Sequence, residues 1–93
     1  MNKYLCVDNH DCKSALTVGN VYSSTKETVW SSSFFKGDID LVWVINDLGY
    51  EDGYARDVYF RRIEFIDSDN KKFRVKGAKI GELLSYLSKN KED

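Results

Sequence analysis

Five consecutive apolar residues set the strongest constraint on the fold, because residues 41–45 read Leu-Val-Trp-Val-Ile. Successive side chains of a β-strand point to opposite faces of a sheet. Neither face of this segment carries a polar residue, so we expect residues 40–46 to form a central strand that is covered on both sides. Trp43 should then belong to the core.

A helix near the C-terminal end is the natural cover for one of those faces. Ile80, Leu83, Leu84 and Leu87 have the spacing of a single helical face. A helix of about eleven residues is marginal in water by itself. We therefore expect it to pack on the sheet over residues 41–45.

A tight turn and a second strand are predicted in the first part of the chain. Gly19 and Asn20 lie between β-forming residues, a pattern typical of a turn that leads into a strand. The polar residues 23–28 follow, and we expect the strand to fray there.

Residues 59–66 and 71–75 predict a hairpin. A register that sets Ile63 opposite Val75 requires an odd number of loop residues, and residues 68–70 meet that demand. The same register places two like charges, Arg62 and Lys76, side by side. Such a pair on a solvent face suggests an anionic partner.

The size and the N-terminal sequence limit the class of protein. A chain of 93 residues makes one domain with a thin core. Residues 1–8 contain no long apolar stretch, so we expect neither a signal peptide nor a transmembrane segment. Two cysteines in such a chain are expected to stay reduced, and the predicted location is the cytoplasm.

Catalytic equipment is not evident. Cys6, His10 and Cys12 are the only group that resembles a metal site, but zinc takes four ligands, usually in paired short spacings. The chain has one histidine, whose orienting acid for a nucleophilic relay cannot be identified. No phosphate-binding glycine motif is present. We predict ordinary packing for the cysteines, a surface position for His10, no metal, no cofactor and no enzymatic activity.

Charge is distributed unevenly along the chain. Residues 1–55 carry four basic and eight acidic residues, whereas residues 56–79 carry eight basic and four acidic ones. The basic segment suits a phosphate backbone or an acidic protein surface; the alternative is that it only solvates the hairpin and protects an edge strand. The candidate binding residues of this segment are Arg56, Arg61, Arg62, Lys72, Arg74 and Lys76. Tyr54, Tyr59 and Phe60 would add stacking platforms for nucleic acid if they were exposed.

A second candidate surface is aromatic. Trp30, Phe34 and Phe35 flank a serine-rich stretch. Aromatic side chains on a loop suit a contact with another protein, and they equally suit a lid over the open end of a small barrel.

Three short motifs carry a resemblance to a known group. Residues 3–9 read K-Y-L-C-V-D-N, residues 16–22 read L-T-V-G-N-V-Y, and residues 44–49 read V-I-N-D-L-G. This pattern resembles a group of small bacteriophage proteins. The resemblance implies an SH3-like β-barrel of phage origin, mostly without assigned activity. It covers roughly the first fifty to sixty residues, and the chain departs from the group in residues 28–40 and in its C-terminal hairpin and helix.

These observations predict an α+β fold, a small bent antiparallel sheet or partly open SH3-like barrel with one C-terminal helix packed on it. Residues 1–66 would form the SH3-like core of the single domain, and residues 67–93 the last hairpin strand and the helix. The expected function is binding and inhibition of a host protein, such as a CRISPR or other anti-phage defence complex. The alternative is a nucleic-acid-binding barrel that uses the basic strand face.

Overall fold

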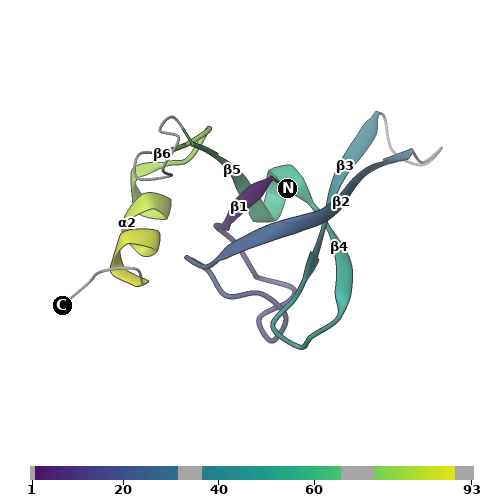
Figure 1. Cartoon of the computed structure of the whole chain (residues 1–93), viewed down its shortest axis with the longest axis horizontal. Coiled ribbons are helices and arrows are strands. Elements are labelled where there is room, and N and C mark those ends of the chain that lie inside the picture. The colour runs from purple at the N-terminus through teal and green to yellow at the C-terminus, as the bar shows by residue number, and fades with distance from the viewer. Residues whose placement is uncertain (1, 32–36, 66–72, 90–93) are drawn as a thin grey trace.

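The fold is a six-stranded antiparallel sheet with strand order β4-β3-β2-β1-β5-β6, which does not close into a barrel. The computed structural model describes residues 2–31, 37–65 and 73–89. The sheet and its C-terminal helix confirm the α+β class (Figure 1). The elements are β1 (Lys3–Cys6), β2 (Val21–Ser31), β3 (Asp38–Ile45), β4 (Glu51–Ala55), α1 (Arg56–Tyr59), β5 (Phe60–Phe65), β6 (Phe73–Val75) and α2 (Ile80–Lys89).

The main buried cluster lies on one face of the sheet, which we call the inner face; Leu5 and Ile63 are buried on the other face of β1 and β5. Val42 and Val44 of β3 are fully buried there, beside aromatic side chains from several strands. The Phe60 ring contacts Tyr4 at 5.9 Å and Tyr22 at 6.0 Å between centroids. The buried cluster consists of Tyr4, Cys6, Leu16, Tyr22, Val42, Val44, Tyr54 and Phe60.

The prediction that β3 is covered on both sides is wrong. Only the inner face is buried; on the outer face, Ile45 is 52% exposed and Trp43 is half-buried. The Trp43 ring lies over Gly53, and its Nε1 donates a hydrogen bond to Thr28 Oγ1 at 2.8 Å. Trp43 is therefore a residue of the outer face and not of the core.

The helix α2 does not cover this outer face, because it is held at the other end of the sheet. Three strands separate β3 from β6 in the strand order. Helix α2 lies next to β6 (Figure 1), where the Phe73 and Tyr86 rings are in contact at 5.5 Å and Arg61 pairs with Glu82 at 3.4 Å. Sequence periodicity identifies the apolar stripe of a helix but not the strand that it meets.

The prediction that β2 frays over residues 23–28 is also wrong, since β2 runs unbroken for 11 residues. Its polar side chains have partners on neighbouring strands. Thr25 Oγ1 donates to the Trp43 carbonyl at 3.1 Å, and Glu27 accepts hydrogen bonds from Tyr4 and Asn2. A bulge interrupts the pairing with β3 between Ser24 and Lys26. Beyond it, β2 and β3 project from the body as a two-stranded ribbon (Figure 1).

The predicted hairpin register is confirmed. Ile63 lies opposite Val75, and Glu64 lies opposite Arg74. The backbone N–H of Lys76 donates to the Arg62 carbonyl at 2.9 Å, so these two cations are neighbours as expected. The predicted loop at residues 68–70 lies outside the described residues. Gly19, with a positive φ of 91°, forms the predicted turn before β2.

Candidate partner-binding site

Four of the predicted basic residues, which come from α1, β5 and the segment after β6, line one pocket. The pocket has a volume of about 390 Å³ and opens on the inner side of the sheet next to the core. We call it the basic pocket. It is lined by Tyr4 of β1, Glu27 of β2, Arg56 and Asp57 of α1, Phe60, Arg61 and Arg62 of β5, and Lys76 and Gly77 after β6.

A tyrosine and a glutamate form the polar floor of the pocket. Tyr4 is buried, and its hydroxyl donates to Glu27 Oε1 at 2.5 Å; Asn2 Nδ2 donates to Glu27 Oε2 at 2.6 Å. Burial raises the pKa of Tyr4 to about 12, and Glu27 adds to the shift. The hydrogen bond from Tyr4 lowers the pKa of Glu27. The floor therefore holds a neutral hydroxyl and a carboxylate whose two oxygens already have partners.

Two of the arginines, Arg56 and Arg61, form ion pairs with carboxylates of the same chain. Arg56 Nη2 pairs with Asp40 at 2.8 Å, and its Nε pairs with Asp57 at 3.2 Å. Arg61 Nη1 donates to the carbonyls of Asp57 and Phe60, and its Nη2 pairs with Glu82. These guanidinium groups fix α1 against β3, β5 and α2. They contribute walls to the pocket and little free positive charge.

Arg62 and Lys76 supply the free charge at the rim. Arg62 Nη2 donates to the Asn2 side-chain oxygen at 3.3 Å, which is a neutral acceptor. Within the described part of the chain, neither Arg62 nor Lys76 has a carboxylate at ion-pair distance. Two adjacent cations that lack an ion-pair partner among the described residues, beside a buried hydroxyl, form a site that favours an anionic group.

The remaining candidates do not join this pocket. Arg74 lies on the same strand face but pairs with Glu64 at 2.8 Å. Trp30 lies on the opposite face of the sheet, because it pairs with Ile39, whereas Glu27 pairs with the inward-facing Val42. The structure thus places Trp30 on the face opposite the basic pocket. Lys72, Phe34 and Phe35 lie outside the described residues.

The stacking platforms proposed for nucleic acid are not exposed. Tyr54 and Phe60 belong to the buried core. Tyr59 is half-buried and stacks on His10, with ring centroids 5.6 Å apart. Sequence reasoning missed Tyr4 and Glu27, because their contact joins positions 23 residues apart and no binding motif in the sequence contains either residue.

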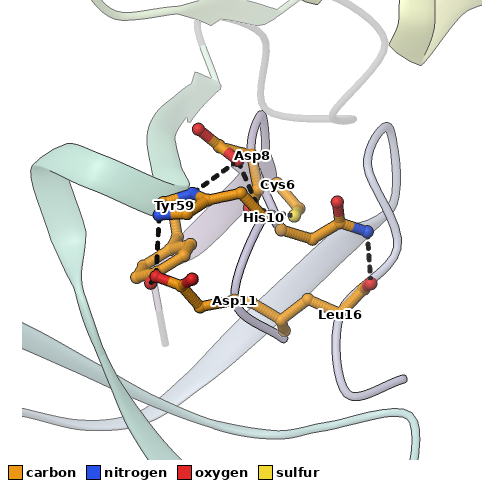
Figure 2. Close-up of polar contacts among 7 residues, drawn as sticks. Cys6, Asp8, His10, Asp11, Leu16 and Tyr59 are labelled. Atoms are coloured by element: carbon orange, nitrogen blue, oxygen red, sulfur yellow. Dashed lines mark hydrogen bonds and ion pairs between the residues drawn. The ribbon is translucent and has the colours of Figure 1, made fainter. Parts of the chain in front are cut away.

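The residues considered for zinc form a different arrangement (Figure 2). His10 Nδ1 lies 2.9 Å from Asp8 Oδ1, and its Nε2 lies 2.7 Å from Asp11 Oδ2. An imidazole donates to two carboxylates at once only when both of its nitrogens carry a proton. The hydrogen bond with Asp8, assisted by Asp11, raises the pKa of His10. His10 therefore lies at the surface between two acids that favour its protonated form.

The two cysteines pack as expected for ordinary side chains. Cys6 is buried in the core, and its thiol donates to the Asp8 carbonyl at 3.4 Å. Burial raises the pKa of Cys6 to about 12, which keeps this thiol protonated. Cys12 is half-buried. In the described ranges, no group of three or more His, Cys, Asp or Glu side chains is arranged to hold a metal ion.

Comparison with protein-family models, with curated proteins and with solved structures gave no match. The functional interpretation therefore rests on the site. None of the helices among residues 2–31, 37–65 and 73–89 is long and apolar enough to cross a membrane.

Proposed function

We propose that this protein is a non-catalytic binding protein whose basic pocket receives a carboxylate from an acidic segment of a partner protein. The observation that carries the proposal is the position of Arg62 and Lys76, two neighbouring cations that have no ion-pair partner among the described residues and that line a pocket floored by Tyr4 and Glu27. A carboxylate accepts hydrogen bonds from several donors at once, and bonds from charged donors are the stronger ones.

A protein carboxylate suits the pocket better than a nucleic-acid backbone does. Affinity for a backbone grows with the number of phosphates that are neutralised, but Arg56, Arg61 and Arg74 are already paired with carboxylates. Glu27 and Asp57 also line the pocket and would repel a continuous row of phosphates. A single anionic group can avoid them by binding at Arg62 and Lys76.

The projecting ribbon extends the same surface. Val29 of β2 lies two residues beyond Glu27, on the same strand face, and is 59% exposed. The partner could place an acidic side chain in the pocket and a neighbouring apolar side chain on the ribbon, so that it makes both a charged and an apolar contact. Such a pairing is typical of protein interfaces, which combine an apolar centre with a polar rim.

In this proposal the partner is a host protein that the small chain binds and inhibits; the resemblance implies the phage origin, and the inhibitory role extends it. An SH3-like arrangement of β1 to β5 and a role against a defence complex are parts of the same proposal. The basic pocket and the small β-rich fold support this proposal.

Capture from a nuclease-treated host lysate tests the proposal. We expect the wild-type chain to retain a protein in stoichiometric amount, and Arg62→Glu and Lys76→Glu to lose it. Lys13→Glu makes the same charge change at an exposed residue outside the pocket and should retain the protein. Equal capture by all three variants would refute the role of the pocket. Recovery of nucleic acid that disappears with nuclease would instead support the nucleic-acid alternative.

A further inference from the structure

One apolar surface of the protein takes no part in the site described above. Strand β3 carries a row of apolar side chains on the outer face of the sheet, and we call this row the open face. The register places Ile39, Leu41, Trp43 and Ile45 of β3 on this face, with Trp30 of β2 opposite Ile39. Ile45 is 52% exposed, whereas Ile39, Leu41 and Trp43 are half-buried. Lys26 lies over the Trp43 ring and pairs with Glu51 at 3.9 Å. Contiguous apolar faces of this kind usually mark an interaction site.

A second apolar surface lies on α2. Ile80, Leu84 and Leu87 are 78%, 60% and 57% exposed, and they occupy one side of the helix because their spacing is that of a helical face. Glu82 and Tyr86 hold the other side of α2 to β5 and β6. The helix is therefore docked through its polar and aromatic side while its aliphatic stripe faces outward.

These two surfaces suit each other but lie at different ends of the sheet. Three strands separate β3, which carries the open face, from β6, next to which α2 lies. Figure 1 shows α2 beside β6, on the side of the molecule away from the β2–β3 ribbon. While α2 keeps its contacts with Arg61 and Phe73, it does not cover the open face of its own chain.

Charge favours a second copy of the same chain as the occupant. The described residues from β2 to β4 carry one basic residue, Lys26, against six acidic ones. The described residues from β5 to α2 carry six basic residues against two acidic ones, Glu64 and Glu82. A copy that places its α2 end against the β2–β4 end of its neighbour therefore brings opposite charges together.

We propose that the protein forms a two-fold symmetric dimer in which α2 of each copy packs its aliphatic stripe on the open face of the other. A ten-residue helix is about 15 Å long. One such contact is small beside the roughly 1,200–2,000 Å² that a stable specific interface buries. The reciprocal arrangement doubles the contact and closes the assembly, so that neither copy is left with an unpaired surface.

Site-directed crosslinking between two different variants tests this pairing. One variant carries Leu84→Cys on α2 and the other carries Ile45→Cys on β3, both in a Cys12→Ser background because Cys12 is half-buried and Cys6 is buried. We expect a short bis-maleimide to link the mixed variants into a dimer. As a matched control, Lys13→Cys should give little product with either variant, because Lys13 lies on neither apolar surface.

The mass of the uncrosslinked protein completes the test. Sedimentation velocity should show a concentration-dependent dimer, and Leu84→Lys should weaken the association by about tenfold or more while circular dichroism stays unchanged. A monomer at every concentration would overturn the proposal. A crosslink formed within one chain that carries both Leu84→Cys and Ile45→Cys, without dimer formation, would also overturn it, because α2 would then cover its own sheet.

Discussion

Replacing Gly53 with alanine should destabilise the protein, because the indole ring of Trp43 lies directly against this glycine. A Cβ at position 53 would lie 2.8 Å from Trp43 Cε2 and 3.0 Å from Cδ2 and Cζ2. Carbon atoms in favourable contact are about 3.5–4.0 Å apart. The backbone of Gly53 is not left-handed, so the conflict is with the ring and not with the conformation of residue 53.

The expected loss in the free energy of unfolding follows from the contacts that the Trp43 ring would lose. A shift away from Gly53 strains or breaks the 2.8 Å hydrogen bond from Trp43 Nε1 to Thr28, worth about 0.5–1.5 kcal/mol. It also disturbs the contact of Lys26 Nζ with the ring, at 4.4 Å from the centroid. Overpacking costs about 1–3 kcal/mol, while the loss of glycine flexibility returns about 0.5–1 kcal/mol. We expect a net loss of about 1–2 kcal/mol in the free energy of unfolding.

Urea denaturation followed by tryptophan fluorescence and circular dichroism measures this loss. The matched control is Gly81→Ala in α2, where an added Cβ meets nothing within 4 Å; it should stabilise the protein by up to about 1 kcal/mol. In a Trp43→Leu background, Gly53→Ala should cost much less, which is the coupling expected of residues in contact. A Gly53→Ala protein as stable as the wild type would refute the packing argument.

Three further results are expected. Asn46→Ala should lower the free energy of unfolding by about 1–3 kcal/mol in denaturant titrations, because the buried Asn46 side chain bonds Leu48 N, Tyr50 N and the Tyr54 hydroxyl; an unchanged midpoint would contradict this. In an NMR titration, His10 should have a pKa above 6.5, and Asp8→Asn should lower that pKa. Because folding raises the pKa, the stabilisation by His10 is complete below its unfolded-state pKa and disappears as pH rises through its folded-state pKa. A normal pKa of His10 in the wild type would show that the contacts with Asp8 and Asp11 do not form. Tyr4→Phe should raise the pKa of Glu27 toward its ordinary value in a carboxyl NMR titration, since the Tyr4 hydroxyl is the main cause of its depression; no change would remove the hydroxyl from the floor of the pocket.

The sequence predicted the elements better than their packing. The alternation of apolar and polar residues, together with the odd number of loop residues that it requires, predicted the register of β5 and β6 correctly, because both are local properties of a hairpin. The apolar run at residues 41–45 identified β3 but not its partners. Apolar residues on a face show that burial is favourable, and they do not show that the same chain provides the cover.

The candidate site was predicted in part, for similar reasons. Charge counting found Arg62 and Lys76, but it could not separate them from Arg56 and Arg61, which are paired with carboxylates distant in sequence. Tyr4 and Glu27 meet only because β1 and β2 are neighbours in the sheet and a bulge follows Ser24. The side of the sheet that Trp30 occupies depends on that same bulge, since one extra residue reverses the faces of all that follow.

The most direct test of the proposed function is an NMR titration of the isotope-labelled protein with a short acidic peptide, repeated with a single-stranded oligonucleotide of equal charge. The proposal predicts that the peptide shifts the backbone amide signals of Tyr4, Arg62, Lys76 and Gly77 in a saturable manner. The shifts should be lost in Arg62→Glu and retained in Lys13→Glu, and the oligonucleotide should bind more weakly. Stronger binding of the oligonucleotide, or shifts from the peptide that avoid the basic pocket, would contradict the proposal.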